Sequence, residues 1–204
     1  MKHVLLIEDE LIVAMDIKMS LEKKNGFVVS TARNYTEALK IYNNKLIDVV
    51  VCDVNLNTDK DGIEVIEAFS LIKPVPVVYL TAYDNPEILE RAKKTLPYAY
   101  LLKPFNESQL VLTLDLAHLN FKRQEKKLVV KAENQNKLKD LTLREKEVLI
   151  VLATGKTSKE IADTLNISQH TVDKHKKNIK KKLGLNTIGE LVKFAYSTNL
   201  KTLN

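Results

Sequence analysis

The chain has 204 residues, 45% hydrophobic and 28% charged, which is typical of a globular protein. No apolar run approaches the roughly 18 residues of a transmembrane helix, so no membrane span is expected. The net charge is +6, but the charge is distributed unevenly along the chain. Residues 1–119 hold 13 Lys/Arg against 17 Asp/Glu and are acidic. Residues 120–140 hold 7 Lys/Arg against 3 Asp/Glu, and residues 141–204 hold 12 against 6, so both are basic. This asymmetry indicates two modules. The basic second module favours a polyanionic partner such as nucleic acid, although a basic solvated surface alone would show the same charge.

The N-terminal segment and the single cysteine both bear on the cellular location. A short apolar run meets Glu8, Asp9 and Glu10 at once, which is not typical of a signal peptide. Cys52 cannot form a disulfide within the chain, and it lies in an apolar run where a small buried side chain is expected. These features predict a cytoplasmic protein that does not associate with a membrane.

Short apolar runs alternate with amphipathic stretches over the first 119 residues. The runs are rich in Val, Ile and Leu without period-two alternation, which predicts parallel strands buried on both faces. The predicted strands cover residues 3–7, 27–32, 48–52, 75–80 and 99–102. We therefore predict an α/β domain over 1–119, with a flavodoxin-like, doubly wound, five-stranded parallel sheet. In such a sheet, ligands bind beyond the carboxyl ends of the strands.

The rest of the chain is predicted to be helical. Residues 120–138 are polar and charged and contain neither Gly nor Pro, which predicts a charged, helical or partly ordered linker. Residues 139–204 contain the helix-start pattern Ser/Thr-x-x-Glu three times, which predicts a second, small all-α domain. The three pairs are Thr142 with Glu145, Thr157 with Glu160, and Thr187 with Glu190. Gly155, Gly184 and Asn166 fall where left-handed helix ends are expected.

Polar side chains follow the predicted strands at one edge of the sheet. Glu8 and Asp9 follow the first strand, Asp53 the third, Thr81 the fourth and Lys103 the fifth. Each alone has an ordinary explanation, such as a solvated acidic loop or a threonine that starts a helix. Together, at the edge where such sheets bind ligands, they predict phosphoryl transfer to a carboxylate.

The residue types suit this chemistry. Aspartate is an anion that needs no general base, but acidic neighbours repel an approaching phosphoryl group, and a divalent cation removes that repulsion. Oxygen ligands suit Mg²⁺, with Asp9 and Asp53 as direct ligands and Glu8 acting through water. Lys103 would supply a positive charge to the phosphoryl oxygens, and the Thr81 hydroxyl would donate a hydrogen bond.

Residues 1–119 resemble the receiver domain of two-component response regulators, because LLIEDE, VVVCDVNL, VVYLTAYD and AYLLKPF match in order and spacing. The resemblance implies that Asp53 is the phosphoacceptor for a histidine kinase or phosphotransfer protein. It implies a metal set of Glu8, Asp9, Asp53 and the carbonyl of Asn55, and a phosphoryl-binding and switch set of Thr81, Ala82, Tyr100 and Lys103. It also implies a cis Lys103–Pro104 bond, although Tyr100 could instead be an ordinary edge-strand aromatic.

One segment departs from the commonest receiver pattern. Asn57 stands where proline is usual, and residues 58–60 lengthen the loop before Asp61 and Gly62. The departure bears on the rigidity of this loop and on the lifetime of the acyl phosphate. The small Ala82 leaves the phosphoryl group approachable, which is compatible with slow self-hydrolysis.

Residues 141–196 resemble the LuxR-type helix-turn-helix of the NarL/FixJ regulators. In a helix over 169–183, Val172, Ile179 and Leu183 share one face and lysines occupy the opposite face, which in the second helix of this motif enters the major groove. The expected DNA-binding residues are Gln169, His170, Thr171, Lys174, Lys177 and Lys181, with Lys174 and Lys177 at base edges.

Further basic residues of this helix are expected to pair with phosphates, namely Lys176, Lys180, Lys181 and Lys182. A lysine-rich face is also often merely solvated. His175 flanks the core face and is interpreted as a packing residue. The last helix either closes the domain core or pairs with a second subunit, and the resemblance implies a homodimer in at least one state.

The sequence thus predicts a response regulator, not an enzyme, that accepts a phosphoryl group on Asp53 and regulates transcription by binding double-stranded DNA. We expect Thr81 and Tyr100 to couple the two events. One rival is an aspartyl phosphatase of the haloacid dehalogenase type, but Asn55 stands where its second aspartate is needed. The other is a phosphorylation-independent transcription factor that uses the receiver as an interaction module.

Overall fold

The computed structural model describes residues 1–23, 26–82, 86–198 and 200. The last two residues of the VVYLTAYD motif, Tyr83 and Asp84, lie outside the described residues. The chain divides into two compact units, residues 1–123, here called the α/β unit, and residues 124–204, here called the helical unit. Over the described residues, no helix combines the length and the apolar character needed to cross a membrane.

The α/β unit contains a five-stranded parallel sheet in the order β2-β1-β3-β4-β5, which confirms the predicted fold. The strands are β1 Lys2–Ile7, β2 Phe27–Ala32, β3 Val49–Asp53, β4 Val77–Thr81 and β5 Ala99–Leu102. β3 and β4 are buried throughout, whereas the edge strands β2 and β5 are only partly buried. The order reverses between β1 and β3, and in doubly wound sheets this switch point is where ligands bind.

Two strands run one residue further than expected. Asp53 pairs with Leu80 as the last residue of β3, and Thr81 pairs with Leu102 as the last residue of β4. Main-chain hydrogen bonds extend this ladder, from Val54 N to Leu80 O at 3.0 Å and from Lys103 N to Thr81 O at 2.8 Å. The polar side chains of Asp53 and Thr81 are therefore held by rigid strand ends rather than by loops.

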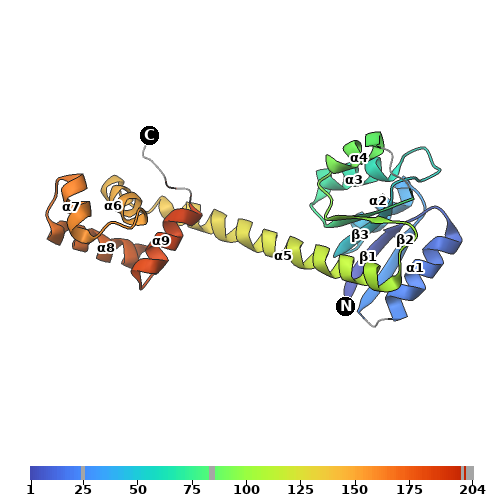
Figure 1. Ribbon diagram of the computed structural model, residues 1–204, viewed down its shortest axis with the longest axis horizontal. Coiled ribbons are helices and arrows are strands. Elements are labelled where there is room, and N and C mark those ends of the chain that lie inside the picture. The colour runs from blue at the N-terminus through green and yellow to red at the C-terminus, as the bar shows by residue number, and fades with distance from the viewer. Residues whose placement is uncertain (24–25, 83–85, 199, 201–204) are drawn as a thin grey trace. The chain divides into compact units, whose positions relative to one another are not determined.

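Helices cover both faces of the sheet (Figure 1). One face is packed by α1, Leu11–Lys23, and by the first turns of α5, Glu107–Leu138, through Ala14, Ile17, Leu21, Leu110, Leu114 and Ala117. The other face is packed by α2, Tyr35–Asn44, α3, Gly62–Ile72, and α4, Pro86–Lys93. Each helix buries an apolar stripe, so the sheet has two cores and the polar residues are confined to its edges.

The helical unit contains α6 Leu143–Ala153, α7 Ser158–Leu165, α8 Gln169–Leu183 and α9 Ile188–Ser197. All three predicted capping boxes are confirmed, at the starts of α6, α7 and α9. Left-handed backbone occurs at Gly155, Asn166 and Gly184, as expected, and also at Leu96, which was not predicted. Val172, Ile179 and Leu183 pack in the core, together with Leu191, Phe194 and Ala195 of α9. The last helix therefore does close the core of this unit.

The segment expected as a linker, residues 120–138, is the second half of α5. Residues 134–138 make contacts within the helical unit. Asn134 Nδ2 donates to Ser197 Oγ at 2.7 Å, Gln135 Nε2 donates to Thr198 O at 2.6 Å, and Leu138 packs against the core. The C-terminal turns of α5 are thus fixed to the segment at the end of α9.

Candidate functional site

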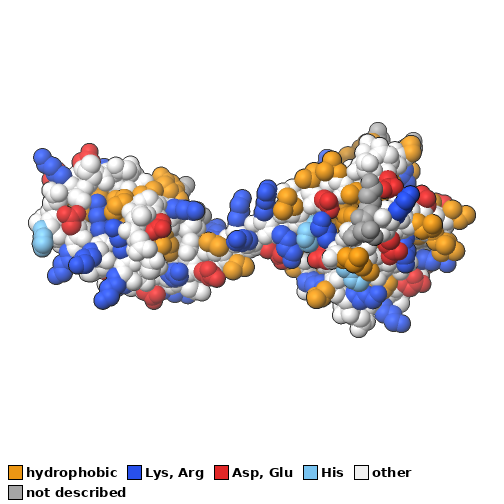
Figure 2. Space-filling view, turned by 90° about the horizontal axis from the view of Figure 1, so that it is seen from below, with side chains coloured by type: hydrophobic (Ala, Val, Ile, Leu, Met, Phe, Trp, Pro, Cys, Tyr) orange, Lys and Arg blue, Asp and Glu red, His pale blue; other side chains and the backbone are white. Residues whose placement is uncertain are grey.

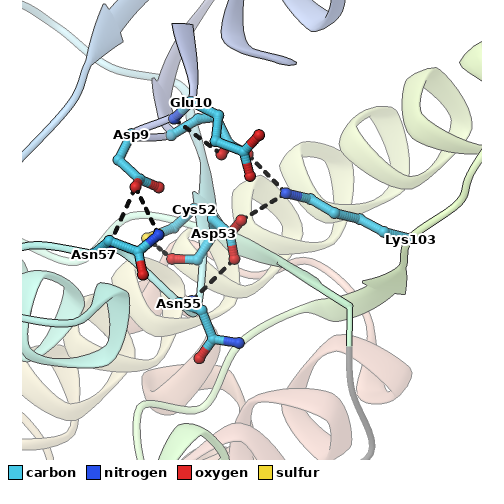
Figure 3. Close-up of polar contacts among 8 residues, drawn as sticks. Asp9, Glu10, Cys52, Asp53, Asn55, Asn57 and Lys103 are labelled. Carbon is cyan, nitrogen blue, oxygen red and sulfur yellow. Dashed lines mark hydrogen bonds and ion pairs between the residues drawn. The ribbon is translucent and has the colours of Figure 1, made fainter. Parts of the chain in front are cut away.

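A cluster of two buried carboxyl groups and one half-buried lysine lies at the carboxyl ends of β1, β3 and β5. Lys103 Nζ, just past β5, lies 2.5 Å from Oδ2 of Asp53 and 2.8 Å from Oε2 of Glu8. The other oxygen of the Asp53 carboxylate, Oδ1, accepts a hydrogen bond from the main-chain N–H of Asn55 at 2.9 Å (Figure 3). The structure therefore brings together residues that are 50 and 95 positions apart in the sequence.

Burial controls the electrostatics of this cluster. Glu8 is fully buried and Asp53 is 6% exposed. Burial raises the pKa of Glu8 above its ordinary value, against the lowering effect of its hydrogen bond from Lys103, and the charge of Asp53 adds to the rise. Burial alone would lower the pKa of Lys103, but its bonds to Asp53 and Glu8 outweigh burial and raise it. One ammonium group thus faces two carboxyl groups.

The donor set around Asp53 fits a hard divalent cation. The carboxylates of Asp9 and Asp53 and the main-chain carbonyl of Asn55 offer oxygen atoms, which Mg²⁺ prefers as ligands. Among the described residues, no three Asp, Glu, His or Cys side chains are gathered closely enough to hold a cation on their own.

Of the predicted switch residues, Thr81 ends β4 at the same edge of the sheet as Asp53, whereas Tyr100 lies within β5 and pairs with Tyr79. Thr81 is 7% exposed at the end of β4, and Ala82 next to it is exposed. Tyr100, on β5, stacks on Tyr79 with ring centroids 5.6 Å apart. Its hydroxyl is buried and finds no hydrogen-bond partner among the described residues. The Lys103–Pro104 bond is cis, as predicted.

Two residues at this site were not assigned a role from the sequence. Gly62 opens α3 so close to β3 that a Cβ atom there would lie 1.9 Å from the carbonyl oxygen of Asp53 and 2.8 Å from Cys52 Sγ. Asn57 is the second, and its side-chain Nδ2 donates a hydrogen bond to Asp9 Oδ2 at 3.0 Å. The only signal for Gly62 was its place after Asp61, which caps α3. Cys52 is buried as predicted, and burial raises the pKa of its thiol.

The outward face of α8 in the helical unit is basic. Gln169, His170, Lys174, Lys177 and Lys181 are exposed, whereas Thr171 is half-buried. Figure 2 shows several Lys and Arg side chains on the surface of this unit. His175 is half-buried with its Nδ1 enclosed, which agrees with a packing residue. His170, Lys174, Lys177 and Lys181 share the side of α8 opposite its core residues, whereas Gln169 is exposed at the first position of the helix.

Two lysines of α8 that were expected to pair with phosphates are instead engaged inside the unit. Lys176 is buried, and its Nζ donates to Ser158 Oγ of α7 at 2.8 Å. Lys182 Nζ forms an ion pair with Glu145 Oε2 of α6 at 2.7 Å and donates to Asp140 O at 3.2 Å. The buried Lys176 is therefore not presented to a DNA phosphate, whereas Lys182 is exposed and its phosphate contact stays a prediction.

Glu145 is a buried anchor between α6 and α8, so replacing it with alanine is expected to destabilise the helical unit by about 2–3 kcal/mol. Burial alone would raise the pKa of Glu145, but hydrogen bonds from Lys182 and Thr142 outweigh it and hold the pKa below its ordinary value. Since the folded-state pKa is depressed, this stabilisation is complete above the unfolded-state pKa, about 4.3, and is lost as the pH falls through the folded-state value.

Urea unfolding of the full chain at pH 7 and at pH 3 measures this effect. The difference in the free energy of unfolding between the wild type and Glu145→Ala should be smaller at pH 3 than at pH 7. Glu147→Ala is the control, because Glu147 pairs with Arg144 at a site where both side chains are about one-third exposed, and it should cost less than about 1 kcal/mol. Equal losses of stability from the two substitutions would contradict the assignment of Glu145 as the buried anchor between α6 and α8.

The two units match known families. Residues 4–115 match the model of the response regulator receiver domain, and residues 139–195 match that of the bacterial regulatory proteins of the luxR family. The transcriptional regulatory protein MctR of Rhizobium johnstonii is 30% identical over 198 residues, which cover 95% of this chain and 92% of MctR. The oxygen regulatory protein NreC of Staphylococcus aureus is 27% identical, over 97% of this chain and 98% of NreC.

Solved structures agree on the fold. Response regulator StyR has a TM-score of 0.65 with 25% identity, over 96% of this chain and 99% of StyR. Full-length FixJ from B. japonicum has a TM-score of 0.61 with 24% identity, over 100% of this chain and 98% of FixJ. The α/β unit is therefore a receiver domain, and the helical unit is a LuxR-type DNA-binding domain. The chain belongs to the response regulators that regulate transcription.

Proposed function

We propose that Asp53 is the phosphoacceptor of this response regulator, that a histidine kinase or phosphotransfer protein is the donor, and that phosphorylation controls the binding of double-stranded DNA by α8. The observation that supports it most is the contact of Asp53 with Lys103 at the switch point of the sheet. A regulator of this kind acts where the DNA is, so we propose a cytoplasmic location.

In the proposed reaction an oxygen of the Asp53 carboxylate forms a bond to phosphorus, the phosphorus–nitrogen bond of the donor phosphohistidine breaks, and the leaving imidazole takes up a proton. The carboxylate needs no general base. The side chain is held at the end of β3 by Lys103 and by the N–H of Asn55, so it is oriented before the donor arrives.

Mg²⁺ held by Asp9, Asp53 and the Asn55 carbonyl, with Glu8 acting through water, would reduce the repulsion between the acidic residues and the phosphoryl group. Lys103 would exchange its bonds to Asp53 for bonds to the phosphoryl oxygens, and Thr81 would donate its hydroxyl. Phosphorylation adds about −1.5 to −2 charges. We propose that Thr81 and Tyr100 then repack β4, β5 and their helices and promote a homodimer.

The test is to treat the full chain with acetyl phosphate and Mg²⁺, to reduce the acyl phosphate with borohydride, and to map the reduced residue by peptide mass spectrometry. Reduction at Asp53 is expected, together with a higher affinity for DNA and a larger mass in light scattering. Reduction at another carboxylate, or no incorporation, would overturn the assignment of Asp53. If Asp53 is phosphorylated but the affinity for DNA does not change, the result would favour a transcription factor that works independently of phosphorylation.

On the DNA side, Lys177→Ala is expected to cost about 1–3 kcal/mol of binding and to relax the sequence preference, because an exposed lysine on the outward face of α8 would meet base edges. Lys181 is proposed to contact a DNA phosphate, so Lys181→Ala should mainly reduce the salt dependence of the DNA affinity. Titrations at several salt concentrations, on a duplex selected from a random library and on an unrelated duplex, measure both. If Lys177→Ala lowers the affinity for both duplexes equally, Lys177 does not contact base edges.

A further inference from the structure

The loop between β3 and α3 begins with two anchored residues and then becomes exposed. The side chains of Val54 and Leu56 are 2% and 6% exposed, whereas Asn55 and Asn57 between and after them are exposed. The buried pair holds the first half of the loop against the core. Asn57 is therefore presented next to the charged cluster by an ordered stretch of chain.

Asn57 makes two hydrogen bonds to one oxygen of Asp9. Its side-chain Nδ2 donates to Asp9 Oδ2 at 3.0 Å, and its main-chain N–H donates to the same oxygen at 3.3 Å (Figure 3). The main chain of Asp9 is held as well, because Arg33 Nε donates to the Asp9 carbonyl at 3.3 Å. Asp9 is thus fixed by donors from two different loops.

The far end of the same loop is also fixed. Lys60 Nζ lies 3.9 Å from the centroid of the Tyr35 ring at the start of α2, and Thr58 Oγ1 donates to Lys60 O at 2.8 Å. A cation above an aromatic face contributes roughly 0.5–1 kcal/mol at an exposed site. Contacts at both ends of the loop therefore support the position of Asn57 beside Asp9.

A carboxylate that must bind a cation loses rotamer freedom when it does so, and this cost weakens binding. Hydrogen bonds that fix the carboxylate beforehand remove part of that cost, and partners of this kind commonly change metal affinity 10–100-fold. We propose that Asn57 is a positioning residue of the phosphorylation site, which holds the Asp9 carboxylate in place for a divalent cation. This inference rests on the proposed cation site of Asp9 and Asp53.

Titration of the full chain with Mn²⁺ alone, followed by the electron paramagnetic resonance signal of the free ion, measures cation affinity without any phosphoryl transfer. Asn57→Ala is expected to weaken Mn²⁺ binding about tenfold. Asn57→Gln, which keeps the amide donor on a longer side chain, should recover part of the affinity. Asn44→Ala is the matched control, because Asn44 is exposed and its Nδ2 donates to Lys40 O of its own helix. Its Mn²⁺ affinity should equal that of the wild type.

The outcomes separate the inference from the proposed function. If the wild type does not bind Mn²⁺, the proposed cation site fails and the inference fails with it. If the wild type binds and Asn57→Ala binds equally well, the inference alone is overturned. Tighter binding by Asn57→Ala would also overturn it, because Asn57 would then compete with the cation for Asp9. Melting temperatures of the variants check that the fold is intact, and a Mn²⁺ affinity that falls without a fall in melting temperature supports positioning.

Discussion

Replacing Asp53 with asparagine is expected to abolish phosphoryl incorporation. The asparagine side chain has nearly the same shape, but its amide is not a nucleophile towards phosphorus. The change also removes a charge from a buried cluster in which Glu8 and Asp53 share the single cation Lys103. After the substitution one carboxylate faces one ammonium group, so the fold should be at least as stable as the wild type.

Intact mass after acetyl phosphate treatment and thermal unfolding of the same samples separate the two effects of Asp53→Asn. The expected result is no added phosphoryl group, an equal or higher melting temperature, and a DNA affinity that no longer responds to acetyl phosphate. Asp59→Asn is the control, because Asp59 is exposed in the neighbouring loop. Full incorporation in Asp53→Asn would show that another residue is the acceptor.

Gly62→Ala is expected to destabilise the receiver domain by about 3 kcal/mol and to impair phosphorylation as well. The added Cβ would lie 1.9 Å from the Asp53 carbonyl oxygen and 3.0 Å from its carbonyl carbon, and neither backbone atom can move aside without shifting β3 or α3. Overpacking of this kind costs about 1–3 kcal/mol, and more when the backbone is involved. A shift of about 1 Å at a reacting group can cost 10²-fold in rate.

Urea unfolding and the rate of acetyl phosphate incorporation measure both consequences. Gly189→Ala is the matched control, because Gly189 also lies in the first turn of a helix but its added Cβ would meet nothing closer than Thr187 Oγ1 at 4.0 Å. Alanine there should be neutral or stabilise by up to about 1 kcal/mol. Gly62→Ala with wild-type stability and rate would show that the close approach of α3 to Asp53 is not needed.

Much of the receiver domain was predictable because its signals are local. The strands follow from short buried runs, and parallel strands place their carboxyl ends at one edge, so the residues that follow them had to be near one another. In the same way each capping box is complete within four residues, as at Thr142 with Glu145. A capping box involves only residues close together in the sequence, so it can be predicted without knowledge of the packing.

The burial of Lys176 could be predicted from the sequence, whereas the ion pair of Lys182 could not. Lys176 follows Val172 by four residues and precedes Ile179 by three, so helical periodicity alone puts it on the buried side of α8. For Lys182 the sequence offers no such signal. Its partner Glu145 is 37 positions away, and only the packing of α6 against α8 brings the two together.

The sequence by itself determined which polar residues come at the ends of the strands, Asp53 among them, and the basic outward face of α8, because both follow from residue type and from spacing along the chain. Only the tertiary structure decided which polar atoms meet. The bond of Asn57 to Asp9 joins residues 48 positions apart, and the contact of Lys103 with Asp53 joins residues 50 apart. Such pairings depend on loop conformation and on helix packing, which no local pattern encodes.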